Sequence, residues 1–333
     1  MSKPPRFTFA ISSYDHVNDV VDGRIPIENA EPLFIRLPIP EMFRRFVIAR
    51  DWDVSEMSFV QYGTLRAAGE RGIVGIPVFP SRLYRQSAIF VRADRITAPE
   101  DLRGGRIGIV GWANSAGVWA RGALSDMHGI AAADVTWYQG GVERPGRAEV
   151  IGPRYVPDDV KIVRVTDRGI EEMLWTGDLD GIIVPSPPAS VEASISSGGL
   201  IRLLYEDFPA AERAYRDQTG CVPIMHVVAL DRALFEQDPD IARRLYEALE
   251  RARVEYFASL AQRCPTLVPI PWVDEHIESM RAALGNEVWP YGVEANRPTL
   301  ETYLRYLRDQ GLVDGGFGVD DLFPEWQAVT DER

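Results

Sequence analysis

The sequence predicts an α/β fold with two lobes and a cleft between them. Strand-like apolar runs alternate with amphipathic helical segments along most of the 333 residues, which is the pattern of α/β architecture. One unit also interrupts the other, because a strand leaves the first lobe near residue 90 and "PIMHVVAL" returns to it near residue 225. We therefore expect a discontinuous first domain of residues 1–90 and 206–333, and an inserted second domain of residues 91–205.

The first domain holds strands and helices with recognisable ends. A helix begins at Pro40, whose fixed φ suits a first turn, and another follows Ser58, whose spacing to Gln61 is a capping-box pattern. We expect strands in the N-terminal part at residues 6–12, 31–37, 53–59, 72–79 and 87–92. After the strand in "PIMHVVAL", long amphipathic helices begin near Asp238, Asp274 and Pro298.

The inserted domain shows the same alternation. A helix over "SAGVWARGALSDMH" is capped by Asn114 or Ser115 and ended by Gly129, and a later helix ends at Gly177. We expect strands within "RIGIVG", "DVTWYQ" and "GIIV", and a further short strand in "LIRLL".

Composition excludes several classes of function. A formal net charge of −13 and a pI of about 4.9 argue against nucleic acid as a partner, since phosphate neutralisation needs a basic face. No apolar run approaches the roughly 18 residues that a membrane span needs, and the N-terminal residues do not read as a secretory signal. Two cysteines, Cys221 and Cys264, suit a reducing compartment without a disulfide. We therefore expect a cytoplasmic protein.

Two arginines stand in the turn "FPSRLYR", between two apolar strands. Arginine binds carboxylates in a planar, bidentate manner, so Arg82 and Arg85 are candidates for an anion-binding clamp. In so acidic a chain, an anionic small molecule has to be bound by such a local cluster of cations. The alternative is that both arginines are solvated surface residues. We predict that they face the cleft, whereas Arg121, within a helix, supports packing.

Polar residues also mark the junctions where strands lead into helices. Helix N-termini attract anions through free N–H groups and the helix dipole, although caps are needed whether or not a ligand binds. We expect these junctions to face the cleft and to contribute substrate contacts from Tyr14, Ser58, Asn114, Ser115 and Ser186.

Several segments carry a resemblance to a known family. They include "YDHVNDVVDGRIPIENAEPLFIRL", "FRRFVIARDWDVSEMSFVQY", "TWYQGGVERPGR" and the more specific "PVFPSR", "VWARG" and "PIMH", and together they cover most of residues 14–232. The chain resembles the 4,5-dihydroxyphthalate decarboxylase family, whose members are similar to type II periplasmic-binding proteins. Two features depart from the family pattern: Gln86 stands where relatives tend to have histidine, and "GWANSAG" differs before "VWARG".

The resemblance implies a two-lobed, type II periplasmic-binding-protein-like fold and a non-oxidative decarboxylase. Its substrate would be a small hydroxylated aromatic carboxylate, 4,5-dihydroxyphthalate-like, and the reaction needs no redox cofactor. Such a site needs cations for the carboxylates, an acid that protonates carbon, and groups that hold the ring hydroxyls.

Histidine titrates near neutral pH, so His16 and His226 are the candidate proton donors. Asp15 could orient His16 or accept a hydroxyl proton, and Glu56 could do likewise. A hydrogen-bonded core histidine is the alternative for His226, which lies on an apolar strand. The remaining histidines, His128 and His276, are expected to be structural.

A divalent metal is the alternative to a metal-free site, if Asp15, His16, Glu56 and His226 converge. No HExxH or paired CxxC motif supports it. A dinucleotide fingerprint, a P-loop and a GxSxG nucleophile elbow are also absent from the sequence.

Two classes of function fit these observations. The first is a cofactor-independent carboxy-lyase of aromatic compound catabolism. The second is a solute-binding or ligand-sensing protein that captures a small organic anion without chemistry. The long C-terminal helices are compatible with a homodimer, although no heptad seam supports one.

Overall fold

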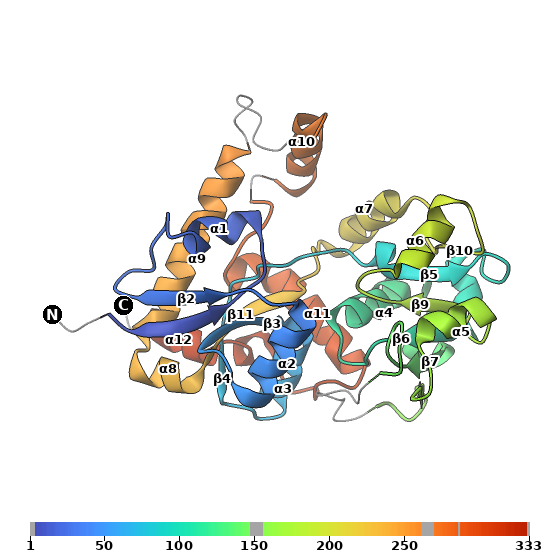
Figure 1. Cartoon of the computed structure of the whole chain (residues 1–333), viewed down its shortest axis with the longest axis horizontal. Coiled ribbons are helices and arrows are strands. Elements are labelled where there is room, and N and C mark those ends of the chain that lie inside the picture. The colour runs from blue at the N-terminus through green and yellow to red at the C-terminus, as the bar shows by residue number, and fades with distance from the viewer. Residues whose placement is uncertain (1–3, 147–155, 261–269, 286, 332–333) are drawn as a thin grey trace.

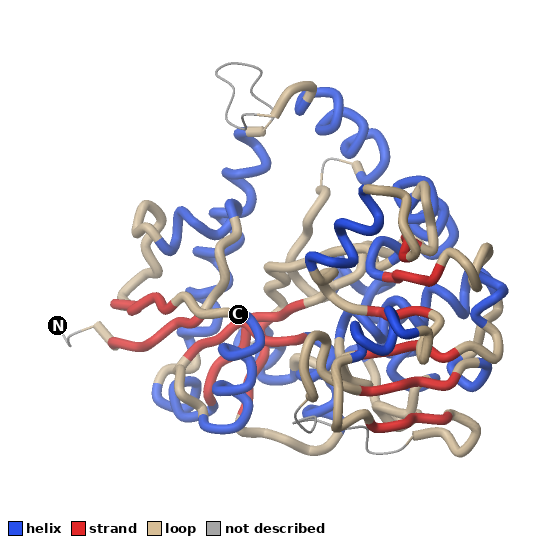
Figure 2. The backbone as a smooth tube through the Cα atoms, turned by 45° about the vertical axis from the view of Figure 1, so that its right-hand side comes forward, coloured by secondary structure: helices blue, strands red, loops and turns tan. Residues whose placement is uncertain are grey.

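The computed structural model describes residues 4–146, 156–260, 270–285 and 287–331. Its strands form two sheets, and each sheet is the centre of one α/β lobe (Figure 1). The same two groups of strands stay apart when the molecule is turned by 45° (Figure 2). The two-lobed α/β fold predicted from the sequence is confirmed.

The first sheet has the strand order β2-β1-β3-β11-β4. Strand β1 pairs in parallel with β2 and β3, whereas β11 runs antiparallel between β3 and β4. The strands are β1 (Arg6–Ala10), β2 (Glu31–Ile35), β3 (Val54–Ser58), β4 (Ile73–Ile76) and β11 (His226–Asp231). The C-terminal end of β3 therefore lies beside the start of β11, a segment that is far away in the sequence.

The second sheet has the strand order β10-β5-β9-β6-β7-β8. All six strands come from the part of the chain between β4 and β11. They are β5 (Ile89–Arg92), β6 (Arg106–Ile109), β7 (Thr136–Gln139), β8 (Lys161–Arg164), β9 (Gly181–Ile183) and β10 (Ile201–Leu203). Strand β8, at the edge of this sheet, was not among the predicted strands.

Helices cover both sheets and end where local sequence signals place their caps. The side chain of Ser58 accepts a hydrogen bond from the Gln61 amide, and that of Asn114 accepts one from the Gly117 amide. Gly129 ends its helix in the left-handed conformation, with φ at 62°. The helices nearest the site are α1 (Asp15–Val21), α2 (Ile39–Ala49), α3 (Phe59–Ala67), α4 (Ser115–His128), α9 (Asp240–Ser259), α10 (Val273–Leu284) and α11 (Arg297–Asp309).

The remaining helices complete the outer layers of the two lobes. They are α5 (Ile170–Thr176), α6 (Ala189–Ser196), α7 (Phe208–Thr219), α8 (Arg232–Gln237) and α12 (Pro324–Asp331). Helix α7 follows the second sheet in the sequence, and its Tyr215 packs in one cluster with Ala123 of α4.

Helix α4 joins the second lobe to the C-terminal helices. The ring of Tyr306, on α11, packs where Gly122 has no side chain, since a Cβ there would lie 2.3 Å from ring carbons. Arg121 donates hydrogen bonds to the side chain of Gln310 and the carbonyl of Trp112, and its guanidinium lies 3.9 Å from the Trp112 ring centroid. Arg121 therefore supports packing, and the "VWARG" segment serves the same contact.

Helix α10 differs from the other helices in its surroundings. Both views place it beyond the end of α9, away from the two sheets (Figures 1 and 2). None of its residues is buried, and Trp272, which precedes it, is 79% exposed. The part of the chain that the structure describes contains no helix long and apolar enough to cross a membrane.

Candidate active site

The arginine-bearing turn lies along the segment that leads into β11. The amide of Met225 donates to the carbonyl of Ser81 at 2.8 Å, and Arg82 and Ile224 form an antiparallel bridge. Two segments that are about 140 residues apart in the sequence are thus paired through their backbones. This pairing fixes the positions of both arginines relative to the start of β11.

Arg82 is buried, and its guanidinium contacts only neutral groups. It donates to the carbonyls of Val222 at 3.2 Å and Pro290 at 2.7 Å, and to the side-chain oxygen of Asn296. No carboxylate of the described residues forms an ion pair with it, and its Nε is buried without a partner. Burial lowers the pKa of Arg82 to about 9. The charge is held in place, but no described acidic residue neutralises it.

Arg85 is buried as well, at 8% exposure, and has weaker contacts. Its Nε donates to the sulfur of Met225 at 3.1 Å, and its Nη1 lies 3.5 Å from the carbonyl of Pro185. Burial lowers its pKa to about 10, with a smaller opposing contribution from the charge of Glu212. Burying a charge without a paired counter-charge is unfavourable, so both guanidinium groups are suited to an anionic ligand.

Three of the predicted site residues form one hydrogen-bonded group: Tyr14, Glu56 and His226. Nδ1 of His226 lies 2.5 Å from Oε1 of Glu56, and the Tyr14 hydroxyl donates to the same oxygen at 2.5 Å. The Tyr14 hydroxyl is also 3.2 Å from Nδ1 of His226. The second oxygen of Glu56 accepts from the amide of Ser12 at 2.8 Å.

Sheet register explains why these residues meet. Glu56 of β3 stands opposite Val228 of β11, and His226 stands opposite Ser58, so Glu56 and His226 are diagonal neighbours on one face of the sheet. Tyr14 comes from the end of the segment that follows β1, the strand next to β3. Two paired strands, β3 and β11, and the segment that follows β1 thus supply the group.

Two members of the group, Glu56 and Tyr14, have a defined protonation state. Burial alone would raise the pKa of Glu56, but the hydrogen bond and charge of His226 and the bonds from Tyr14 and Ser12 lower it, so Glu56 is a carboxylate. Burial and the Glu56 charge raise the pKa of Tyr14 well above its usual value, so its hydroxyl keeps its proton. Glu56 is fully buried, whereas the His226 side chain is 14% exposed. The imidazole is therefore the more accessible partner of this pair, although Tyr14 is the one member of the group that lines the cavity described next.

A cavity of about 590 Å³ lies beside this group, with Tyr14 in its wall. Segments from α1, the arginine-bearing turn, α9 and α10 surround it. The lining residues are Ser13, Tyr14, Asp15, His16, Pro80, Ser81, Arg82, Tyr256, Phe257, Leu260, Val273, His276, Ile277, Met280 and Trp289. Tyr14, Asp15, His16 and Arg82 of the predicted site thus line one cavity.

His16 is surrounded by aromatic rings in the wall of this cavity. Its ring centroid lies 5.6 Å from that of Tyr14, 5.7 Å from Trp289 and 6.3 Å from Phe257. Its Nε2 is buried without a hydrogen-bond partner. Burial lowers the pKa of His16 to about 4, against the smaller raising effect of Asp15, so its imidazole is neutral at pH 7.

Replacing His16 by glutamine should flatten the pH dependence of stability. The unfolded chain binds a proton at His16 below about pH 6.5 and the folded chain only below about pH 4, so stability falls with decreasing pH across that window. Between these two pH values, the free energy of unfolding of the wild-type protein should fall by on the order of 3 kcal/mol more than that of His16→Gln, as measured by urea unfolding. His128→Gln, at a surface pair with Glu100, is the control. The prediction is wrong if the free energy of unfolding depends on pH equally in His16→Gln and in the wild-type protein.

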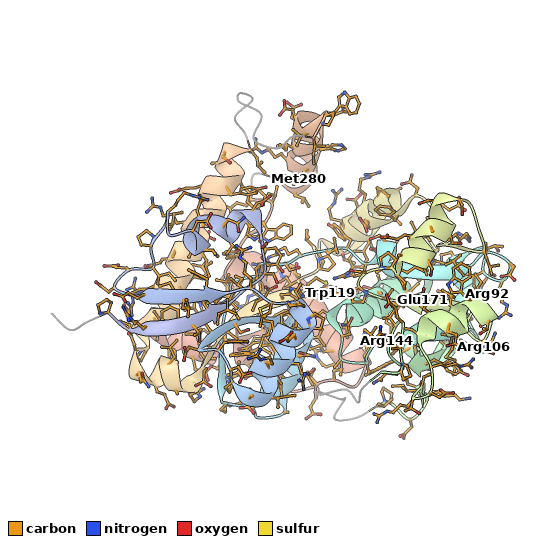
Figure 3. The ribbon with its side chains drawn as sticks, viewed as in Figure 1. Arg92, Arg106, Trp119, Arg144, Glu171 and Met280 are labelled. Atoms are coloured by element: carbon orange, nitrogen blue, oxygen red, sulfur yellow. The ribbon has the colours of Figure 1, made fainter. Side chains whose placement is uncertain are left out.

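The serines predicted to bind substrate contact one another across the lobes. Oγ of Ser58 lies 2.8 Å from Oγ of Ser115, and Ser115 also donates to the carbonyl of Met225 at 3.0 Å. Asn114 caps α4. Ser186 lines a separate cavity of about 480 Å³ with Glu143 and Arg144. Figure 3 labels Arg144 on the second lobe. The structure therefore brings Ser58 and Ser115 to the junction of the lobes and places Ser186 apart from the cavity that holds Arg82.

Comparison with known proteins gives a family. The chain is 31% identical over 320 residues to a 4,5-dihydroxyphthalate decarboxylase of Comamonas testosteroni, and the match covers 96% of each chain. The chain belongs to the 4,5-dihydroxyphthalate decarboxylase family. A second 4,5-dihydroxyphthalate decarboxylase, from Pseudomonas putida, is 36% identical over 184 residues, which are 55% of this chain and 71% of the relative. No protein-family model matches the chain. Both relatives are carboxy-lyases by name, and we assign the chain to this enzyme class.

Solved structures show the fold. A periplasmic sulfonate-binding protein of Methylobacillus flagellatus superposes with a TM-score of 0.55 at 13% identity, over all of this chain and 96% of that one. A Candida albicans protein with the generic periplasmic-binding-protein fold gives a TM-score of 0.53 at 11% identity, over 97% and 95% of the two chains. The expected type II periplasmic-binding-protein-like fold is confirmed.

The motifs that carry the family resemblance have structural roles in this site. "PVFPSR" and "PIMH" are the two segments that pair beside Arg82. Gln86, the departure from the family pattern, is buried: its side-chain oxygen accepts from the Arg85 amide at 3.1 Å, and its nitrogen lies 3.6 Å from the sulfur of Met127. Gln86 therefore acts on the turn and is not among the residues that line the cavity.

A divalent metal was the alternative to the expected metal-free site. Among the residues that the structure describes, no three His, Cys, Asp or Glu side chains are placed to hold a metal ion.

Cys221 is a buried free thiol, and Cys264 lies outside the described residues. His276, expected to be structural, is exposed and lines the cavity from α10. Tyr256 lies on the amphipathic helix predicted to begin near Asp238, but no sequence signal shows that it lines a cavity.

Proposed function

We propose that the chain catalyses the non-oxidative decarboxylation of a hydroxylated aromatic carboxylate that is similar to 4,5-dihydroxyphthalate. One observation carries the proposal. Three consecutive residues, the last of which begins β11, contact the candidate groups: Ile224 bridges to Arg82, Met225 accepts from Arg85, and His226 pairs with Glu56. One short backbone segment would therefore hold both the carboxylate site and the proton donor.

Arg82 and Arg85 would bind the carboxylate groups of the substrate. Both carry a buried charge that no described acidic side chain neutralises, and guanidinium groups match carboxylates in geometry. Removing one partner of a buried charged pair costs roughly 2–5 kcal/mol, so this contact is strong enough to position the substrate.

His226 would deliver the proton to the ring carbon that bears the carboxylate. Protonation at this carbon gives a cationic or ketonic ring intermediate. The bond to the carboxylate then breaks, carbon dioxide leaves, and the electron pair of that bond restores the aromatic ring. Glu56 holds Nδ1 of His226 at 2.5 Å and so fixes the orientation of the imidazole.

A ring hydroxyl makes this protonation easier when it loses its proton. His16 is neutral and has an unpartnered Nε2 in the cavity wall, so it would accept a hydrogen bond or the proton from such a hydroxyl. The reaction takes up one proton at carbon and releases carbon dioxide, with no change in oxidation state that would require a redox partner. We propose that the enzyme works without a redox cofactor or a metal.

A panel of hydroxybenzoates and hydroxyphthalates tests this function. At least one acid should release carbon dioxide stoichiometrically with the decarboxylated phenol, and dialysis against a chelator should leave the rate unchanged. Loss of turnover on chelation, restored by a divalent ion, would overturn the metal-free mechanism. Tight binding with unaltered recovery of every acid would favour the solute-binding alternative.

Location and assembly belong to the same proposal. A cytoplasmic enzyme would keep the buried Cys221 reduced. Cell fractionation tests the location, and sedimentation tests whether the chain forms a homodimer.

A further inference from the structure

The cavity beside Tyr14 has two chemically different sides. One side carries the polar and charged groups, namely Ser13, Asp15, His16, Ser81 and Arg82. The other side is formed by α9, α10 and Trp289, and it is mostly apolar, with Tyr256 and His276 as its polar members. A ligand that fills the cavity therefore meets charge at one end and a largely apolar wall at the other.

The polar side is built for an acid. Arg82 supplies a cation without a carboxylate partner among the described residues, and His16 supplies a buried nitrogen without any hydrogen-bond partner. Buried polar groups in folded proteins nearly always have partners, so these two atoms point to a ligand that provides them.

The apolar side includes one face of α10. Val273, Ile277 and Met280 lie on one face of α10 at helical spacing, and all three line the cavity. Met280 is labelled on this helix in Figure 3. Helix α10 contributes no buried residue to either lobe, so this apolar face is not part of the hydrophobic core. Phe257 and Trp289, stacked at 6.4 Å between ring centroids, extend the same side.

We propose that the substrate is an aromatic acid whose ring carries an apolar substituent on the side opposite the carboxylate. This inference rests on the proposed function and specifies the substrate class of that site. The side chains of Ile277 and Met280 offer no strong hydrogen bond, so a polar ring substituent placed against them is desolvated without compensation, whereas an apolar substituent is not. A volume of about 590 Å³ is within the range of pockets for ligands larger than one substituted ring.

The test uses acids that cannot react. Benzoate, 4-methylbenzoate, 4-ethylbenzoate and 4-propylbenzoate lack the ring hydroxyl that the mechanism requires, so calorimetry measures their binding alone. Affinity should rise about fourfold for each added methylene, which corresponds to about 0.8 kcal/mol per buried group. A series in which affinity stays constant or falls with chain length would overturn the proposal.

Helix α10 offers a matched pair of variants. Ile277→Ala removes an apolar side chain from the cavity wall. Ser279→Ala introduces the same residue, alanine, at an exposed position of α10 that does not line the cavity. Alanine favours helix formation, so both variants should keep α10 helical. The ratio of propylbenzoate to benzoate affinity should fall several-fold in Ile277→Ala and stay at the wild-type value in Ser279→Ala. Equal ratios in the two variants would overturn the proposal.

These results separate this inference from the proposed function. If the alkyl series shows the gradient while no hydroxylated acid releases carbon dioxide, the substrate class stands and the decarboxylase proposal fails. If hydroxyphthalates are decarboxylated while the series is flat, the decarboxylase proposal stands and the inference fails.

Discussion

Replacing His226 by asparagine should lower kcat by a factor of about 10²–10⁴, the usual contribution of a general acid. Asparagine places a side-chain amide near the position of Nδ1, so it can still donate to the buried carboxylate of Glu56. It has no group that titrates, so it cannot hand a proton to the ring carbon. The measurement is the steady-state release of carbon dioxide from the best acid of the panel, with KM recorded alongside kcat.

The control for this variant is His128→Asn. His128 lies at the end of α4 and pairs with Glu100 at 3.0 Å on the surface of the second lobe. Its loss should leave kcat within a factor of two or so, as is usual for surface substitutions. A His226→Asn enzyme that retains a kcat close to that of wild type would remove the imidazole from the mechanism and direct attention to Tyr14 or His16.

Replacing Arg85 by methionine should weaken substrate binding strongly and leave the ligand-free protein at least as stable. Loss of a buried charge partner costs roughly 2–5 kcal/mol, so the affinity for the acid should fall between about 30-fold and several thousand-fold. In the empty protein, however, the guanidinium is buried beside a sulfur and a carbonyl, without a described carboxylate partner. An apolar side chain of similar size should not lower Tm and can raise it.

Arg92→Met is the matched control for Arg85→Met. Arg92 is also 8% exposed, but it pairs with Asp94 at 2.8 Å and donates to two carbonyls at the end of α5, on the far side of the second lobe (Figure 3). Its replacement should lower Tm and leave substrate affinity unchanged. The assignment of Arg85 fails if Arg85→Met binds the acid normally, or if its Tm falls as far as that of Arg92→Met.

Local signals in the sequence predicted much of the fold. Ser58, Asn114 and Gly129 mark helix ends through hydrogen bonds within a few residues, so the sequence alone is sufficient to place them. Helix α7 was missed although its signals are present: Asp207 caps it by accepting from the Ala210 amide at 2.9 Å, and Gly220 ends it. Edge strand β8, with charged residues at both ends, has too little apolar pattern to stand out.

The site was predicted less well because its contacts are long-range. Glu56 and His226 are 170 residues apart, and only the register of β3 with β11 shows that they pair. The sequence likewise treats Arg82 and Arg85 as equivalent. In the structure Arg82 is fixed by the Asn296 side chain and two distant carbonyls, whereas Arg85 donates only to a thioether and, at 3.5 Å, to one carbonyl. Such differences depend on tertiary packing and leave no local pattern.

The absence of buried residues on α10 has an evolutionary consequence. Amino-acid replacements in this helix cost little folding free energy, since they disturb no hydrophobic core. Ile224 and Met225, by contrast, are fully buried, and His226 pairs with Ser58 of β3, so replacements in that segment cost more. Substitutions on α10 therefore alter the wall of the cavity without a matching loss of folding free energy.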